Sequence, residues 1–219
     1  ASPGASPPGA GGAPGAARAP FHLCDALIVP AGKRLVCRVA CQLQRERQAT
    51  EFDVTSSLSR GLRSLIRVRA AETESSASRP RVVIEHPGDG EPLAALSTED
   101  LYRPQLAEED KMLGVLSPSG IRFGAVKRSG GNYLLTRSDG SFLLFKGRFW
   151  AHDVQVLHGD RTVANTERVD AEAYQVSIES GVDAGLVLLG LLAVDKCERL
   201  PAQQRGWSLG FVRAARFAE

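Results

Sequence analysis

No apolar run in the 219-residue sequence is long enough to cross a membrane. The most apolar segment, "AGLVLLGLLAV" from Ala184 to Val194, has eleven residues and is bounded by Asp183 and Asp195. A transmembrane helix needs about 20 apolar residues, so we predict no membrane span. An interfacial helix would need a polar face, which this segment lacks. A helix that is apolar on all sides belongs inside a core, and Asp183 suits its N-terminus.

Cysteine is also scarce. The four cysteines, Cys24, Cys37, Cys41 and Cys197, form no CxxC pair, and no histidine is spaced to complete a zinc site. We therefore predict buried free thiols, no metal and no cofactor. The N-terminus lacks the basic and apolar regions of a signal peptide, which favours a reducing, cytoplasmic compartment.

Motifs of catalysis are missing as well. The sequence contains no GxSxG, HExxH or glycine-rich phosphate loop. His152 beside Asp153 is the one conceivable histidine–carboxylate pair, but neighbours in a strand point to opposite faces. We predict that the protein is not an enzyme.

A large excess of either charge is absent, because the net charge is only +2. This value does not indicate a nucleic-acid partner. The charge is uneven, however: residues 33–81 contain eleven Lys or Arg and five Asp or Glu. Such a region suits an anionic surface such as lipid headgroups, and it equally suits an ordinary solvated surface.

Short β-rich runs joined by turns fill most of the sequence. Asp139-Gly140 and Gly159-Asp160 are the sharpest turn signals, because both residue types tolerate positive φ. The runs begin at "FHLCDALIV" (residues 21–29) and number about a dozen, which predicts a mainly β, antiparallel meander closing into a barrel or sandwich. The apolar run 184–194 favours the closed barrel, whose lumen would bury it as a helix. We expect a turn or short helix leading into a strand at residues 58–70, and a loop with a helical turn at residues 97–111.

The domain organisation follows from composition. Residues 1–20 hold seven Ala, five Gly and five Pro, which predicts a disordered tail able to meet protein partners through its prolines. Residues 21–197 are predicted to form one barrel domain, with its central helix at 183–195. Residues 198–219 form a C-terminal extension that could be a basic amphipathic membrane contact, or could pack on the barrel or be disordered.

Three segments together resemble the tubby C-terminal-like superfamily, and in particular the phospholipid scramblases and LURP-one-related proteins. They are "YQVSIESGVDAGLVLLGLLAVDKC" (residues 174–197), the hairpins of residues 124–169, and "SRPRVVIEHPGDGEPLAAL" (residues 78–96). The resemblance implies a barrel of about twelve strands around a C-terminal hydrophobic helix. It also implies a non-enzymatic, scramblase-like module that binds phospholipid or phosphoinositide at the inner face of a membrane.

The sequence departs from the scramblase pattern at the calcium site. The loop that matches the scramblase calcium site offers only Asp170 and Glu172, too few oxygen ligands for calcium. Phosphate headgroups favour clustered cations, and the candidate lipid-binding residues are Arg60, Arg63, Arg67 and Arg69, with Lys127 and Arg128 as a second patch. The alternative function is a soluble protein-interaction scaffold that does not bind lipid.

Overall fold

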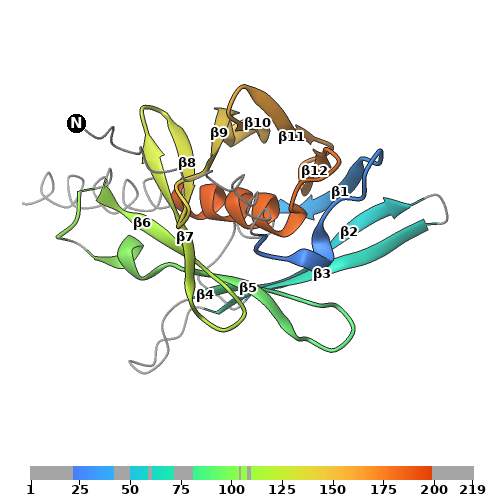
Figure 1. Cartoon of the computed structure of the whole chain (residues 1–219), viewed down its shortest axis with the longest axis horizontal. Helices are drawn as coiled ribbons and strands as arrows, with labels where there is room; N and C mark the ends of the chain where they lie inside the picture. The colour runs from blue at the N-terminus through green and yellow to red at the C-terminus, as the bar shows by residue number, and fades with distance from the viewer. Residues whose placement is uncertain are drawn as a thin grey trace, which may run out of the picture.

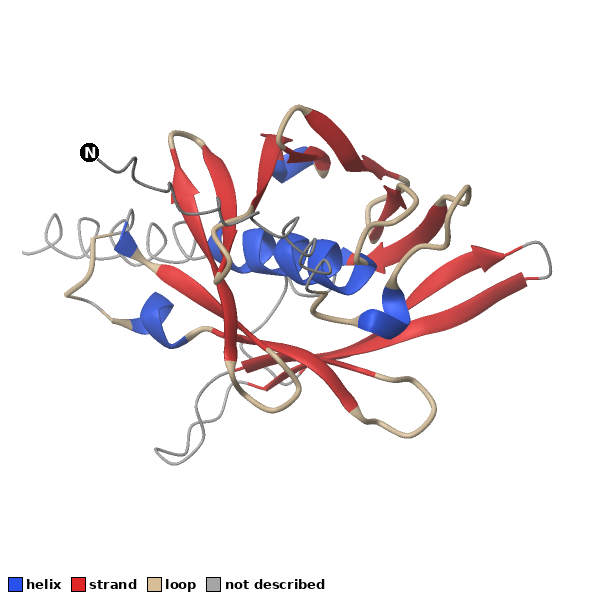
Figure 2. Ribbon diagram, viewed as in Figure 1, coloured by secondary structure: helices blue, strands red, loops and turns tan. Residues whose placement is uncertain are grey.

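A computed structural model describes residues 22–41, 50–58, 61–71, 81–103, 105–107 and 110–198. The predicted N-terminal tail, Arg60 and nearly all of the C-terminal extension lie outside these residues. The described chain forms twelve antiparallel strands and a C-terminal helix at residues 184–198 (Figures 1 and 2). The strands are β1 (Leu35–Ala40), β2 (Thr50–Leu58), β3 (Gly61–Ala71), β4 (Arg81–Glu85), β5 (Pro92–Ser97), β6 (Met112–Leu116), β7 (Arg122–Ser129), β8 (Asn132–Arg137), β9 (Phe142–Arg148), β10 (Asp153–His158), β11 (Arg161–Arg168) and β12 (Ala173–Ile178).

The strands close into a barrel. Each strand pairs with the next along the chain, and β1 pairs with β12 from Leu35↔Ile178 to Ala40↔Ala173. The predicted turns lie where expected: Gly140 and Gly159 have φ of 85° and 60° between paired strands. Closure leaves no free edge in the ladder, so the twelve-stranded barrel predicted from the sequence is confirmed.

The helix at 184–198, called the central helix below, runs through the inside of the barrel (Figure 1). Every residue from Ala184 to Val194 is buried, as the apolar run predicted. Gly190 allows the closest approach, since a Cβ there would lie 2.2 Å from the ring of Phe145. Among the described residues, no helix combines the length and apolar character needed to cross a bilayer.

Asp183 fixes the start of the central helix. One carboxylate oxygen accepts the backbone N–H of Leu186, which is the expected N-cap bond, at 3.0 Å. The other oxygen accepts the N–H groups of Leu23 and Cys24 at 2.7 and 3.0 Å. Ile28 adds an isolated bridge to Asp183, so the segment before β1 closes over this end of the helix.

One prediction of local structure is wrong. Residues 22–29 form no named strand but contain a short 3-10 helix, η1 (Asp25–Leu27), because this segment bonds to Asp183 instead of joining the ladder. The strand expected within residues 58–70 is present as β3, which begins at Gly61 and pairs with β2 up to Leu58. Of the two expected ways into it, the described residues of this stretch contain no short helix, because pairing with β2 overrides the leucine spacing. The helical turn expected within residues 97–111 is present as η3 (Glu99–Tyr102).

Candidate functional site

The predicted arginines on β3 face a row of acids. Arg67 lies 3.3 Å from both Glu51 and Asp53, and Arg69 lies 3.2 Å from Glu85 and 3.7 Å from Glu51. These carboxylates stand on the neighbouring strands β2 and β4, in or beside the register positions of the arginines. Arg67 and Arg69 are therefore both paired with carboxylates, and neither guanidinium group is left unpaired for a phosphate.

A β-bulge separates Arg63 from Arg67. Ile66 pairs with Val54 and Ser64 with Thr55, so Leu65 is the extra residue on β3. One extra residue reverses the alternation of faces, and Arg63 pairs with the buried Ser56. Arg63 is exposed but stands on the opposite face of the β2–β3 ribbon from Arg67, so these arginines do not form one patch.

Lys127 and Arg128 also point apart. Lys127 alternates with the buried Val126 and faces outward from β7. Arg128 pairs with the buried Tyr133 and reaches the end of the central helix, 3.8 Å from Glu198. The second predicted patch is therefore split between the outer wall and the mouth of the barrel.

The structure does bring other cations together on the outer wall of β6–β9. Residues 112–148 contain six Lys or Arg and a single acid, Asp139. Arg122, Lys127 and Lys146 are exposed on this wall, and none of them pairs with a carboxylate among the described residues. We name the outward-facing residues here the β6–β9 wall: Met112, Arg122, Lys127, Leu134, Phe142, Leu144 and Lys146.

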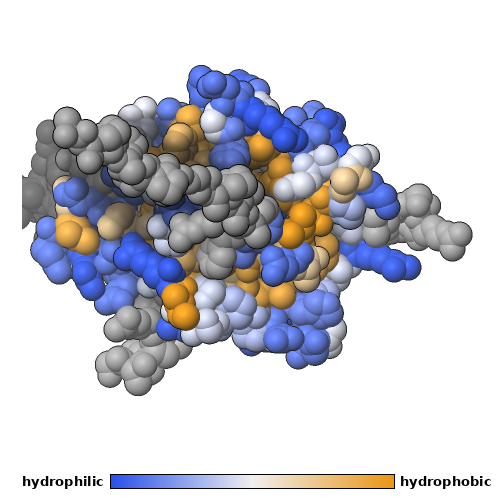
Figure 3. All heavy atoms as spheres, viewed as in Figure 1, coloured by the Kyte–Doolittle hydropathy of each residue, from blue (hydrophilic) through white to orange (hydrophobic). Residues whose placement is uncertain are grey.

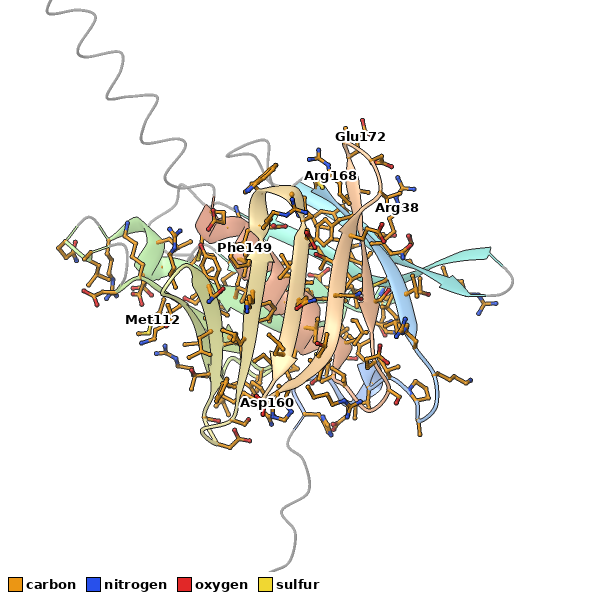
Figure 4. All side chains as sticks on the ribbon, turned by 90° about the horizontal axis from the view of Figure 1, so that it is seen from above. Arg38, Met112, Phe149, Asp160, Arg168 and Glu172 are labelled. Atoms are coloured by element: carbon orange, nitrogen blue, oxygen red, sulfur yellow. The ribbon has the colours of Figure 1, made fainter. Side chains whose placement is uncertain are left out.

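Apolar side chains lie between these cations. One cross-strand row runs from Met112 through Lys127 and Leu134 to Leu144, and then to Leu157 on β10. Each residue of the row is at least partly exposed and alternates along its strand with a buried neighbour. Figure 4 looks onto these strands, with Met112 at one side of the molecule. Figure 3 shows the face seen in Figure 1, where hydrophilic residues lie mostly around the outline and hydrophobic ones between them.

The mouth around the C-terminal end of the central helix contains a second cluster. Cys41 Sγ lies 3.5 Å from Nε2 of His152, and Nδ1 of His152 lies 3.8 Å from a carboxylate oxygen of Asp195. The ring of Tyr174 stacks on His152 at 4.5 Å, and its hydroxyl donates to Asp195 at 3.4 Å. Cys41 and His152 are buried. A thiol, an imidazole and a carboxylate are therefore aligned in that order.

Sequence reasoning missed this cluster because its members are distant in the chain. Cys41 follows β1, His152 precedes β10 and Asp195 lies in the central helix. Asp153, the neighbour considered with His152, instead pairs with Arg148 at 2.6 Å, so their separation is confirmed. Closure of the predicted barrel places the end of β1, and so Cys41, beside β12 with Tyr174. That pairing of the first strand with the last is the one sequence-level clue to part of the cluster.

Backbone hydrogen bonds and an ion pair to Asp170 organise the loop from Asp170 to Glu172. The backbone N–H groups of Glu172 and Ala173 donate to the Asp170 carboxylate, both at 2.8 Å, and Arg38 pairs with it at 2.5 Å. These donors, with that of Glu172 foremost, lower the pKa of Asp170. In the part of the chain that the structure describes, no three His, Cys, Asp or Glu side chains are arranged to hold a metal.

No family model matches the chain, and no curated protein sequence is detectably similar to it.

Proposed function

We propose that the protein is a non-enzymatic module that binds anionic phospholipid surfaces through the β6–β9 wall. The observation that carries the proposal is the combination of Arg122, Lys127 and Lys146 with outward-facing leucines on one face of the barrel. Each cation near an anionic leaflet contributes about 1 kcal/mol to binding. The leucines and Met112 add apolar contact with the headgroup boundary.

Exposed aromatic residues favour the same face. Phe142, at the start of β9, is 43% exposed, and Trp150, in the 3-10 helix η5 (Phe149–Ala151) that follows β9, is 76% exposed. Tryptophan and phenylalanine at a protein surface suit the boundary between headgroups and acyl chains. The two residues would contact the membrane at opposite ends of one strand.

The proposal concerns general anionic lipid and not one headgroup. Lys127 and Lys146 stand on β7 and β9 with β8 between them, so they do not converge on one phosphate. Arg67 and Arg69, which stand closer together, are already paired with carboxylates. We therefore expect phosphatidylserine and phosphoinositides to act through their charge.

Vesicle flotation tests the proposal. We expect the full chain to float with phosphatidylcholine vesicles containing phosphatidylserine, to remain unbound to pure phosphatidylcholine, and to be released by salt. Lys127→Glu together with Lys146→Glu should reduce binding roughly 100-fold or more, because two cations are lost and two anions gained. Lys33→Glu with Arg161→Glu is the control, since it changes the net charge equally at exposed sites outside the wall.

An equal loss in both double variants would show that net charge, and not the wall, determines binding. A chain that binds no anionic vesicle at low salt would contradict the proposal and favour the interaction scaffold. Thermal unfolding of each variant checks that the barrel is retained.

A further inference from the structure

The cysteines of the barrel are not equivalent. Cys24 and Cys37 are buried, and their sulfur atoms each contact a backbone carbonyl, of Leu93 and Val176, at 3.7 Å. Burial raises the pKa of each of these thiols to about 12. A thiol whose pKa is raised in this way carries very little thiolate at neutral pH, so both thiols should be inert.

Cys41 differs because a base stands beside it. Its sulfur lies 3.5 Å from His152 Nε2, and the other ring nitrogen faces Asp195 at 3.8 Å. An imidazole can take the proton of the thiol, and a carboxylate behind it stabilises the resulting imidazolium. The arrangement of nucleophile, base and orienting acid is the one that activates cysteines.

His152 is held in place by a strained backbone. It is the only described residue other than glycine with positive φ, at 50°. The Thr166 hydroxyl donates to the His152 carbonyl at 2.6 Å and accepts the N–H of Val154 at 3.0 Å. With Tyr174 stacked on its ring, His152 is fixed from both backbone and side chain. Strain of this kind is found mainly where a side chain must be aimed.

We propose that Cys41 is a peroxide-reactive thiol, with His152 as its base and Asp195 as the residue that positions His152. The electrophile is a small hydroperoxide, with hydrogen peroxide as the simplest case. Cys41 is only 6% exposed, which favours a small electrophile over bulky acyl or alkyl donors. This inference is independent of lipid binding.

The reaction balances without another reagent. The Cys41 proton moves to His152 Nε2, and the thiolate attacks one peroxide oxygen, so that an S–O bond forms and the O–O bond breaks. The departing hydroxide takes the proton from His152 and leaves as water. Sulfur is oxidised by two electrons and the peroxide is reduced, giving a sulfenic acid at Cys41.

The other thiols of the same chain provide the first test. The full chain is treated with hydrogen peroxide, the sulfenic acid is trapped with a cyclic 1,3-diketone, and each cysteine peptide is followed by mass spectrometry. A Cys197→Ser background removes the half-exposed Cys197. We expect Cys41 to react at least about 10-fold faster than Cys24 and Cys37, and this preference to vanish in denaturant. Equal rates for the three thiols in the folded chain would overturn the proposal.

Variants of the base provide the second test. We expect His152→Gln to slow Cys41 oxidation at least about 10-fold, and Asp195→Asn to slow it less, because Asp195 acts through His152. Retention of the parent rate in a His152→Gln protein that unfolds at the parent temperature would overturn the role of the base. Asp195→Asn should also change the pH dependence of the rate, which a purely structural role would leave unchanged. If the His152→Gln protein does not fold, the comparison of thiols in the Cys197→Ser chain, which keeps His152, still decides the proposal.

Discussion

Aspartates mark both ends of the central helix, but they are bound in different ways. Asp183 accepts three backbone N–H groups, from Leu23, Cys24 and Leu186, at 2.7 to 3.0 Å. The bonds of Asp195 to described residues are longer and come from side chains, His152 at 3.8 Å and Tyr174 at 3.4 Å. Backbone donors cannot titrate or rotate away, whereas an imidazole and a phenol can do both.

The difference assigns separate roles to the two ends. The Asp183 end ties the segment before β1 to the start of the helix, so it fixes the helix inside the barrel. The Asp195 end gathers groups that can exchange protons, next to a thiol and at the mouth of the barrel. Holding the helix in place accounts for the bonds at the Asp183 end. At the Asp195 end, a thiol, an imidazole, a phenol and a carboxylate also lie close enough to exchange protons.

Replacing Asp183 should produce the largest effect. Asp183→Ala leaves three buried N–H groups without their acceptor, so we expect the free energy of unfolding to fall by about 2–4 kcal/mol. Chemical denaturation measures this change. Asp183→Asn is the matched control, because its single carbonyl oxygen restores part of the bonding and should cost less. An Asp183→Ala protein as stable as the parent would show that this end does not anchor the helix.

The sequence predicts the Asp183 end better than the Asp195 end for a physical reason. The N-cap bond spans three residues, and the apolar run from Ala184 to Val194 has only the barrel interior in which to be buried. Alternation and turn residues likewise specify the strands locally. The links from Cys41 to His152 and from His152 to Asp195 span 111 and 43 residues, so they exist only once the barrel has closed.

The candidate lipid-binding residues show the same limit on a smaller scale. The composition of residues 33–81 shows a basic bias. It does not show that carboxylates on β2 and β4 pair with Arg67 and Arg69. The bulge at Leu65, which moves Arg63 to the other face, has no clear sequence signal. Cross-strand pairing decides which cations remain available, and it is a property of register.

A change at the mouth should have a moderate effect. The hydroxyl of the buried Tyr133 donates to Glu198 at 2.7 Å, and burial followed by this bond raises the pKa of Tyr133. We expect Tyr133→Phe to lower the free energy of unfolding by about 1.5–2 kcal/mol, because one hydrogen bond to a charged but partly exposed group is lost. Chemical denaturation of Tyr133→Phe and Tyr174→Phe side by side gives the measurement. The longer 3.4 Å bond of Tyr174 predicts the smaller loss, and the reverse order would contradict a helix end held mainly through Glu198.

The smallest expected effect tests whether the contrast depends on location or on the type of donor. Asp170 lies near the mouth, in the loop between β11 and β12, yet like Asp183 it is held by backbone N–H groups. Its lowered pKa means that its contribution to stability is present above the unfolded pKa and is lost as pH falls through the folded pKa. NMR titration of the folded chain should therefore place its carboxyl midpoint below the ordinary value of about 3.9.

Arg38→Ala separates the two kinds of donor at Asp170. The N–H groups of Glu172 and Ala173 each lower the pKa of Asp170 more than Arg38 does. Its removal should therefore raise the Asp170 midpoint only part of the way, and unfolding should raise it fully. A midpoint that returns to the ordinary value in folded Arg38→Ala would mean that the arginine, not the backbone, holds this carboxylate. The type of donor would then follow location, with backbone donors at the Asp183 end and side-chain donors near the mouth.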